Sequence, residues 1–328
     1  MIEANNVRHE MNRSGKEHRP FLFGVDFEIN KGFFIEDPLN DKRILFKAGA
    51  ISNMGNTLPP CPTPQLEILH TDAAAYASKF EIVHNGLLYG NSFLLNLTER
   101  TPIRTNLTLE QIFYHSRAKY KVLLPDRFVC FSPESFVRIQ GNEISTYPMK
   151  GTIDATLPDA ETLLMNNYKE ECEHYTIVDL LRNDLNMVAQ NIQVRRFRYV
   201  ENIRTLKGEI LQTSSEVVGR LPDNWHNRIG EIIFPFKKIS GFLPAGSISG
   251  APKPSTVKLI QDAEGITRGY YSGVFGYFDG HSLDSAVMIR FIEKEGGQYF
   301  FRSGGGITIN SKAEEEYEEV LEKIYLSI

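Results

Sequence analysis

Cysteine is scarce in this sequence of 328 residues, and the three present, Cys61, Cys130 and Cys172, lie far apart. They form no Cys-x-x-Cys pair and have no neighbouring histidines at zinc spacing, which indicates reduced thiols in a cytoplasmic protein. Long apolar runs are missing too, because no stretch approaches the roughly eighteen apolar residues of a membrane span. Residues 1–13 are polar and lack the apolar core of a signal peptide. We therefore expect a soluble protein that is neither exported nor bound to a membrane.

A surplus of positive charge is also absent. The formal net charge is −5, so the chain lacks the basic surface that nucleic-acid binding requires. Its composition, 41% hydrophobic and 23% charged, is that of a globular protein able to bury a sizeable core. Repeats and low-complexity tracts are missing as well. These properties disfavour nucleic-acid binding and indicate an ordinary globular protein.

The first third of the chain predicts short strands and two helices. Residues 21–29 and 32–35 are apolar runs separated by a turn, which is typical of paired strands. The prolines of segment 58–64 cannot occupy a central strand or a helix interior, so this segment is predicted to be a surface loop. Helical spacing occurs over 72–84 and 108–118, with Thr71 and either Thr105 or Thr108 as the expected caps.

The rest of the chain mixes both element types. Arg127–Ser132 and Ser135–Gln140 are predicted to form a hairpin, and residues 159–190 to form two helices or one bent helix. Ser311 and Glu314 have the spacing of a capping box at the start of a last helix. Four β-branched or aromatic runs predict consecutive antiparallel strands: Gly273–Phe278, Ser285–Ile292, Tyr299–Arg302 and Ile307–Ile309. The pattern therefore favours an α+β protein with much antiparallel sheet.

Four segments carry motifs whose order and spacing are informative. They are Tyr147–Thr152, Glu173–Leu185, Leu243–Lys253 and the run from Gly304 to Lys323. Over roughly residues 130–328 the chain resembles the chorismate-utilising enzymes, a family that includes anthranilate, aminodeoxychorismate, isochorismate and salicylate synthases. The resemblance implies a layered antiparallel β-sandwich core flanked by helices. It implies one catalytic domain over 1–328, with a less typical portion at about 1–110.

The last predicted helix carries a polar stripe. Glu316, Glu319 and Lys323 recur at i, i+3 and i+7 on one face. Taken alone, this pattern is typical of a solvated face with a Glu319–Lys323 ion pair. The resemblance instead implies that Glu319, Glu316 and Glu173 bind Mg²⁺, and that Lys323 contacts a substrate carboxylate. Carboxylate oxygens suit such a hard cation.

Chorismate is a dicarboxylate, and the resemblance implies that Gly304, Gly306 and Arg290 bind it. Three successive glycines after a strand can adopt positive φ and turn their N–H groups toward an anion, although they can also form a simple tight turn. An arginine presents a planar pair of donors to a carboxylate. Without the resemblance, Arg290 would be interpreted as a surface residue of a strand.

Four further residues have both a functional and a structural interpretation. The resemblance places Ser247 and Lys253 beside the substrate, but Lys253 can equally brace its own loop. It places Tyr277 near the substrate's side chain, where an aromatic residue of a strand is as often part of the core. It also places Glu134 close to the reactive lysine, as a group that exchanges protons or as a structural carboxylate.

Lys150 distinguishes between reactions within this family. Anthranilate and isochorismate synthases typically carry alanine at this position, whereas lysine is typical of aminodeoxychorismate synthases. The implied reaction begins with attack of Lys150 on C2 of chorismate as the C4 hydroxyl departs. Ammonia then adds at C4 and expels the lysine, which yields 4-amino-4-deoxychorismate, a precursor of p-aminobenzoate and folate. A nucleophilic lysine must be neutral, so we expect burial or nearby cations to lower its pKa.

Two further observations bear on the reaction and its partners. Many relatives carry histidine where this chain has Gln212, and glutamine cannot act as a general acid, which disfavours pyruvate elimination. A glutaminase domain does not fit in this length, so ammonia is expected from solution or from a separate glutaminase subunit. The alternatives are an anthranilate synthase or an isochorismate or salicylate synthase. A chorismate-binding scaffold for a glutaminase is the non-enzymatic alternative.

Overall fold

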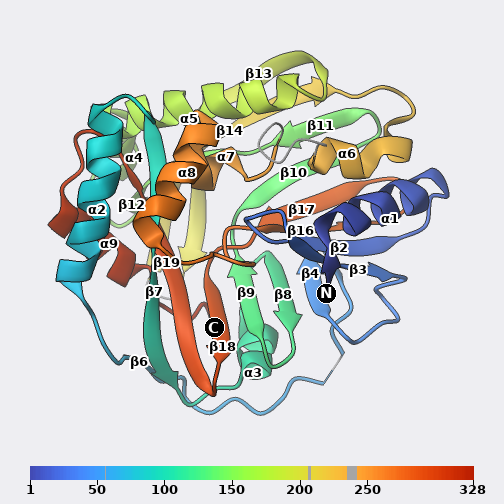
Figure 1. Cartoon of the computed structure of the whole chain (residues 1–328), viewed down its shortest axis with the longest axis horizontal. Coiled ribbons are helices and arrows are strands. Elements are labelled where there is room, and N and C mark those ends of the chain that lie inside the picture. The colour runs from blue at the N-terminus through green and yellow to red at the C-terminus, as the bar shows by residue number, and fades with distance from the viewer. Residues whose placement is uncertain (56, 206–207, 235–241) are drawn as a thin grey trace.

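The computed structural model describes residues 1–55, 57–205, 208–234 and 242–328. Within them, the first of two antiparallel sheets has ten strands in the order β1-β3-β2-β16-β17-β10-β11-β14-β12, with β13 also paired to β14. Its strands are β1 (Ile2–Glu3), β2 (Phe21–Val25), β3 (Lys31–Glu36), β10 (Ser135–Gln140), β11 (Glu143–Thr146), β12 (Met149–Asp154), β13 (Gln190–Thr205), β14 (Gly208–Arg220), β16 (Val274–Phe278) and β17 (Leu283–Val287). Strands from both ends of the chain therefore share one sheet (Figure 1).

The second sheet has nine strands in the described part of the chain, in the order β15-β7-β19-β18-β9-β8-β4-β5, with β6 paired to β7. Its strands are β4 (Leu45–Ala48), β5 (Ile51–Ser52), β6 (Leu66–Ile68), β7 (Leu94–Thr105), β8 (Tyr120–Leu124), β9 (Phe128–Ser132), β15 (Gly250–Ala251), β18 (Phe291–Glu295) and β19 (Gln298–Ile307). The long pair of β7 and β19 lies toward one end of this order, with the short strands β15 and β6 paired to β7.

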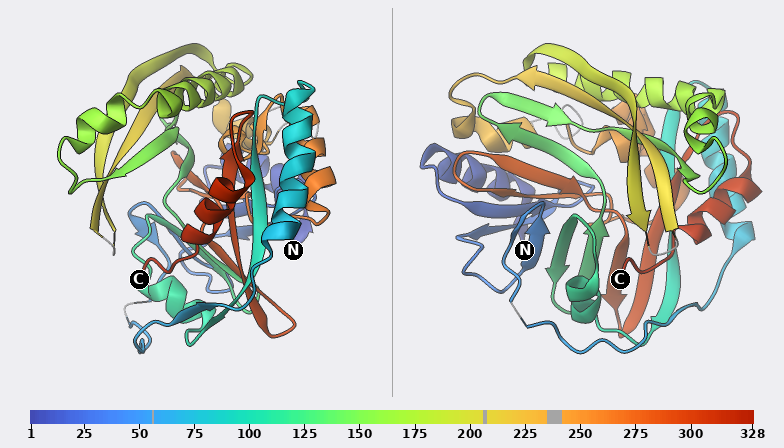
Figure 2. Two further views of the ribbon diagram at one scale, coloured as in Figure 1. Left: turned by 90° about the vertical axis from the view of Figure 1, so that its left-hand side faces the viewer. Right: turned by 180° about the vertical axis from the view of Figure 1, so that it is seen from behind.

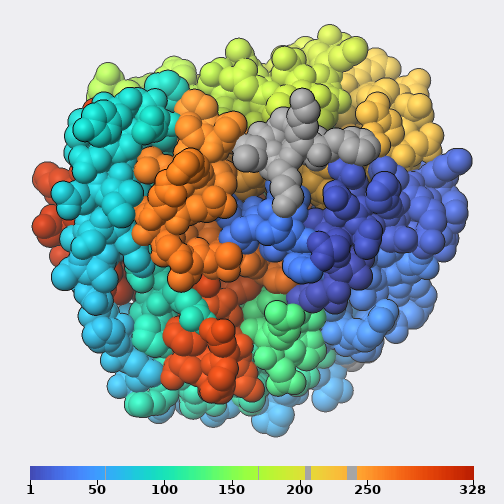
Figure 3. Space-filling model, viewed as in Figure 1, coloured from blue at the N-terminus to red at the C-terminus, as the bar shows by residue number. Residues whose placement is uncertain are grey.

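Helices flank the two sheets. They are α1 (Ala4–Lys16), α2 (Ala73–Leu88), α3 (Leu109–His115), α4 (Ala160–Met165), α5 (Tyr168–Asn186), α6 (Ile229–Ile233), α7 (Gly246–Ser249), α8 (Lys253–Glu264), α9 (Ala313–Glu322) and the 3₁₀ helix η1 (Trp225–Arg228). Figure 3 shows α2 and α8 side by side on one face of the molecule. In the left-hand view of Figure 2, α9 lies between α2 and the β13–β14 pair.

The apolar core lies in layers. Leu22 and Phe33 of the first sheet pack in one cluster with Phe46 and Val122 of the second. Separate clusters join the first sheet to α1, α5 and α6, and the second sheet to α2, α8 and α9. The predicted α+β architecture, with a layered antiparallel core flanked by helices, is therefore confirmed. The amino-terminal portion is integral to it, because β2 pairs along its whole length with β16.

The structure contradicts the predicted hairpin of residues 127–140. β9 lies in the second sheet and β10 in the first, and β10 pairs instead with β11 across the turn at 141–142. Pro133 stands between β9 and β10 and has no N–H to donate to a sheet. The chain therefore crosses from one sheet to the other at Pro133 and Glu134.

A second crossover lies beside the first. The run predicted as one strand, Ser285–Ile292, is two strands, β17 in the first sheet and β18 in the second. The Phe131 N–H donates to the carbonyl of Arg290 at 3.0 Å, and the Val287 N–H donates to that of Glu134 at 3.2 Å. These bonds hold the two crossovers together, which brings Glu134 and Arg290 to one place.

The predictions of helices and loops are largely confirmed, while those of caps are mixed. Residues 159–190 form two helices, and segment 58–64 is an irregular exposed loop. The α2 cap is Asp72, which accepts the Ala75 N–H, and not Thr71, whereas Thr108 caps α3 within a capping box. The predicted capping box of α9 is wrong, because Ser311 accepts the Thr308 N–H and α9 has no side-chain cap.

The helices and the three cysteines can be compared with the expectations from composition. None of the helices in the described ranges is long and apolar enough to cross a membrane. All three cysteines are free thiols, and Cys130 is fully buried between strands. Burial raises the pKa of Cys130, so this residue acts as a small apolar side chain of the core.

Candidate active site

Lys150 lies on β12, beside a β-bulge. Lys150 opposes Thr213 of β14 while Thr152 opposes Gln212, so Gly151 is an extra residue on β12. Gly151 has φ +78°, a conformation that favours glycine. The Thr213 hydroxyl also donates to the Lys150 carbonyl. Bulges next to active sites re-aim side chains, and this one fixes the backbone from which the lysine projects.

The ammonium of Lys150 contacts a carboxylate from α5. Lys150 Nζ donates to Glu173 Oε2 at 3.1 Å, and both side chains are mostly buried. Glu170 lies one helical turn before Glu173, and its Oε2 lies 3.1 Å from where a Cβ on Gly151 would stand. Sequence reasoning missed Glu170, although its i, i+3 spacing from Glu173 was a usable signal.

These carboxylates govern the charge of the lysine. Burial acts to lower the pKa of Lys150, but the charge and hydrogen bond of Glu173, with further contributions from Glu170 and Glu319, outweigh it and raise the pKa. Without a metal ion, the charges of these carboxylates thus oppose the lowering of the Lys150 pKa that burial alone would produce. An ammonium stabilised by anions must lose its proton before it can attack carbon.

The triple glycine lies inside a strand and not in a turn. Gly304, Gly305 and Gly306 belong to β19, pair with β7, and do not adopt positive φ. A Cβ on Gly306 would lie 3.2 Å from Lys150 Nζ. A Cβ on Gly305 would lie 3.3 Å from Glu316 Oε2 and 3.7 Å from Glu319 Oε1. The prediction of a positive-φ turn is wrong, and close approach of charged side chains explains the glycines instead.

Helix α9 supplies the other charged groups. Glu316 is buried, with 4% of its surface exposed, so the alternative of a fully solvated face is wrong for this residue. Lys323 Nζ donates to the Gly304 carbonyl at 2.8 Å and also to Glu319 Oε1. Burial lowers the pKa of Lys323, and Glu319 opposes that shift. Helix α9 therefore places Lys323 against the glycine strand near Lys150.

The carboxylates have the chemistry of a magnesium site without a preformed cage. Among the described residues, no group of three acidic, histidine or cysteine side chains is close enough to hold a metal ion. Glu316 and Glu319 nevertheless converge beside Gly305, and Glu173 contacts the lysine that reaches Gly306. Mg²⁺ usually takes only one or two protein carboxylates and completes its shell with water and substrate oxygens. The donor set therefore fits Mg²⁺ shared with an anionic substrate.

Glu134 and Ser247 meet at the first crossover. Ser247 Oγ donates to Glu134 Oε1 at 2.6 Å. Burial raises the pKa of Glu134, while the Ser247 hydrogen bond and the charges of Lys150 and Arg290 partly offset it. The buried carboxyl therefore favours its protonated form more than an ordinary glutamate does, which suits a proton donor.

Arg290 lies at the second crossover and not in a strand. Its φ is +53°, which is unusual for a residue other than glycine and is typical of functional sites. Arg290 Nε donates to the Tyr325 hydroxyl at 3.1 Å. Sequence reasoning missed Tyr325, because the chain after α9 is irregular and carries no periodic signal.

Two predicted residues lie apart from this group. Tyr277 packs against Phe46 in the core between the sheets, with ring centroids 5.3 Å apart, so its structural interpretation holds. Lys253 Nζ donates to Asp184 Oδ2 at 2.7 Å and to the Phe242 carbonyl at 3.1 Å. Both members of this pair are buried, and burial raises the pKa of Asp184 to about 6. Lys253 therefore braces its loop against α5.

We expect Lys253→Ala to destabilise the fold by about 3–5 kcal/mol, because it leaves the buried Asp184 without its cation. Urea unfolding followed by circular dichroism measures this change. Lys258→Ala is the matched control, since the Lys258–Asp262 pair on the same helix is exposed and should change stability by less than about 1 kcal/mol. Equal effects of the two variants would contradict the bracing role.

His174 was also missed, although it is adjacent to Glu173 in the sequence. It is fully buried, and its Nε2 lies 2.7 Å from Ser215 Oγ, which also accepts the Arg198 N–H at 2.9 Å. Burial lowers the pKa of His174 to about 4, so the ring is neutral at pH 7. This network ties α5 to β13 and β14, and it thereby supports the position of Glu173.

Comparison with known proteins identifies relatives of this chain. The sequence profile of the chorismate binding enzyme family matches residues 38–327. An uncharacterised PabA-like protein of Haemophilus influenzae is 53% identical over 321 residues, which are 97% of this chain and 95% of that protein. Aminodeoxychorismate synthase component 1 of Bacillus subtilis is 31% identical over 76% of this chain and 54% of its own length. The crystal structure of anthranilate synthase component I from Streptococcus pneumoniae superposes with a TM-score of 0.62 at 25% identity, covering 81% of this chain and 59% of that one.

Proposed function

Because this chain belongs to the chorismate-binding enzyme family, we propose that it converts chorismate and ammonia to 4-amino-4-deoxychorismate. The observation that carries the proposal is the place of Lys150, whose Nζ lies 3.1 Å from Glu173 and approaches Gly306. A lysine at this point can form a bond to carbon, whereas the alanine typical of anthranilate and isochorismate synthases cannot. The name of the Bacillus subtilis relative supports the same reaction.

In the proposed reaction, neutral Lys150 attacks C2 of the ring and the C4 hydroxyl leaves. Glu134 donates the proton that turns this hydroxyl into water, a role that its buried carboxyl and the Ser247 hydrogen bond favour. Ammonia then bonds to C4, the Lys150–C2 bond breaks, and the lysine nitrogen recovers its electron pair. The proton released from ammonia returns to Glu134, so the site ends as it began.

The remaining charged residues are proposed to bind the substrate. Arg290 and Lys323 would hold the side-chain carboxylate, with the extended glycine strand leaving room for it beside Lys150. Glu173, Glu319 and Glu316 would hold Mg²⁺, which supplies positive charge to the ring carboxylate. Tyr277 is not included, because it lies in the core.

The product distinguishes this proposal from its alternatives. We expect purified protein with chorismate, Mg²⁺ and ammonium to form 4-amino-4-deoxychorismate without pyruvate, as measured by liquid chromatography and a coupled pyruvate assay. Gln212 supports the absence of pyruvate, because it stands next to Thr213 on the strand paired with Lys150 and cannot act as a general acid. We also expect glutamine to replace ammonium only when a separate glutaminase is added.

Other outcomes would favour other functions. Pyruvate in equal amount to anthranilate or salicylate would establish one of the eliminating synthases. Binding of chorismate without any turnover would support the scaffold alternative. Turnover with glutamine alone would contradict the need for a separate glutaminase.

A further inference from the structure

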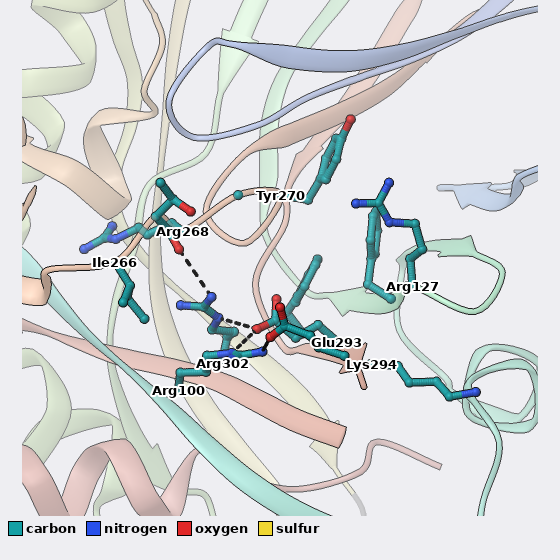
Figure 4. A pocket seen from close by; sticks show the side chains of 13 residues that line it. Arg100, Arg127, Ile266, Arg268, Tyr270, Glu293, Lys294 and Arg302 are labelled. Atoms are coloured by element: carbon teal, nitrogen blue, oxygen red, sulfur yellow. Dashed lines mark hydrogen bonds and ion pairs between the residues drawn. The ribbon is translucent and has the colours of Figure 1, made fainter. Parts of the chain in front are cut away.

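One cavity of the structure lies away from the residues of the candidate active site. It has a volume of about 460 Å³ and lies where β9, β18 and β19 meet the segment 266–270 (Figure 4). None of the residues assigned above to the substrate, the metal or proton transfer lines it. A space of this size accommodates a small organic molecule.

The lining is rich in cations. Five basic side chains line the cavity against two acidic ones, Glu293 and Glu295, and the basic ones are Arg100, Arg127, Arg268, Lys294 and Arg302. Glu264, which does not line the cavity, neutralises Arg268 by accepting two hydrogen bonds of 2.6 and 2.9 Å. Asp126 also pairs with Lys294 at 3.6 Å, so the five basic side chains face four acidic ones and the cavity keeps a small excess of positive charge.

The arginines differ in how they are held. Arg100 and Arg302 share Glu293, which fixes both guanidinium groups, as the dashed lines of Figure 4 show. Arg127 is the last residue of the turn between β8 and β9 and forms no ion pair with any carboxylate in the part of the chain that the structure describes. Its fork of donors is therefore available to a ligand.

Apolar surface completes the lining. Phe128 stacks on Tyr270 and on Phe291, with ring centroids 5.1 and 4.7 Å apart, and these three buried side chains form an aromatic wall behind the cavity. Ile266, which is 50% exposed, adds an apolar edge on the side where Figure 4 places Arg268. An apolar wall beside fixed charges is the usual composition of a small-molecule site.

We propose that this cavity is a second binding site, for a small organic carboxylate with a flat apolar body. The body would lie against the aromatic wall and Ile266, and the carboxylate would accept from Arg127, with Lys294 nearby. A singly charged carboxylate fits better than a phosphate dianion, because Glu293 and Glu295 repel a second negative charge. The proposal does not depend on the reaction proposed for Lys150.

Benzoate titrated into the protein of 328 residues tests the proposal by isothermal calorimetry. We expect one benzoate site. Benzamide should bind at least about tenfold more weakly, because it cannot accept charge-assisted hydrogen bonds, and inorganic phosphate should also bind more weakly, because Glu293 and Glu295 repel its second negative charge. Arg127→Gln should weaken benzoate binding about tenfold, and Lys294→Gln should weaken it less. Arg104→Gln is the matched control, because Arg104 is an exposed arginine of β7 that pairs with Glu67 outside the cavity.

The active site is the competing location for benzoate, and Arg290→Gln separates the two. Binding that survives Arg290→Gln and weakens in Arg127→Gln supports the cavity. Binding that is lost in Arg290→Gln and unchanged in Arg127→Gln overturns the proposal. Equal binding of benzamide and benzoate, or tighter binding of phosphate, would also overturn it, because the ligand class would then be wrong.

Discussion

Lys150→Ala is expected to reduce formation of 4-amino-4-deoxychorismate by more than about a thousandfold, the scale on which loss of a nucleophile acts. The substitution removes the only atom proposed to bond to C2, and it leaves the sheet intact because β12 is held through its backbone pairing with β14. Initial rates with chorismate, Mg²⁺ and ammonium measure the loss. In the unaltered protein without ammonium, intact mass spectrometry should reveal an adduct of chorismate minus water, and this adduct should be missing from Lys150→Ala.

One variant separates the nucleophilic role of Lys150 from its charge, and a second variant is the control. Lys150→Arg keeps a cation beside Glu173 but cannot become neutral, so it should be as inactive as the alanine variant. Lys258→Ala removes an exposed lysine of α8 and should retain full activity. A substantial rate in Lys150→Arg would assign Lys150 an electrostatic role, and a normal rate in Lys150→Ala would reject the nucleophile altogether.

Glu173→Gln and Glu319→Gln are each expected to raise the Mg²⁺ concentration for half-maximal activity by about tenfold or more, as changes at metal sites commonly do. Glutamine preserves volume but removes the negative charge that a hard cation requires. Electron paramagnetic resonance with Mn²⁺ in place of Mg²⁺ measures the same loss as binding, without reliance on turnover. The two carboxylates come from α5 and α9, so one ion would join both helices.

Glu318→Gln is the control for these variants, because Glu318 is an exposed neighbour of Glu319 on the same helix. It should leave Mg²⁺ dependence unchanged. If Glu319 served only as the surface partner of Lys323, Glu319→Gln would change stability by less than about 1 kcal/mol and leave the metal titration unaltered. Unchanged titrations in both Glu173→Gln and Glu319→Gln would remove these carboxylates from the metal site.

Local sequence patterns were sufficient to predict most of the helices and strands and most of the charged residues of the site. Apolar and aromatic runs predicted β2, β3 and β16, and helical spacing predicted α5 and the stripe of α9. These signals depend on neighbours within a few residues, so they survive without knowledge of the fold. The motifs around Lys150 and Glu173 indicated the family for the same reason, since their residues are close in sequence.

The sequence did not predict which of the two sheets each strand joins, and this membership determines where the site residues lie. The link through Glu134 looks like a hairpin turn, and the link through Arg290 looks like the middle of a strand. Each is a crossover between sheets. Which sheet a strand joins depends on partners far away in the chain, here β17 for β10 and β9 for β18. The unusual φ of Arg290 follows from that crossover and has no local signal.

The sequence by itself determined the family, the α+β class and the identity of Lys150, because these depend on residue types at short spacing. Only the tertiary structure decided that Gly305 and Gly306 make room for Glu316 and Lys150, and that Tyr277 belongs to the core. It also decided the direction of the Lys150 pKa shift. That shift depends on which charges lie within a few ångströms in space, and α5 and α9 bring Glu173 and Glu319 there from opposite ends of the motif region.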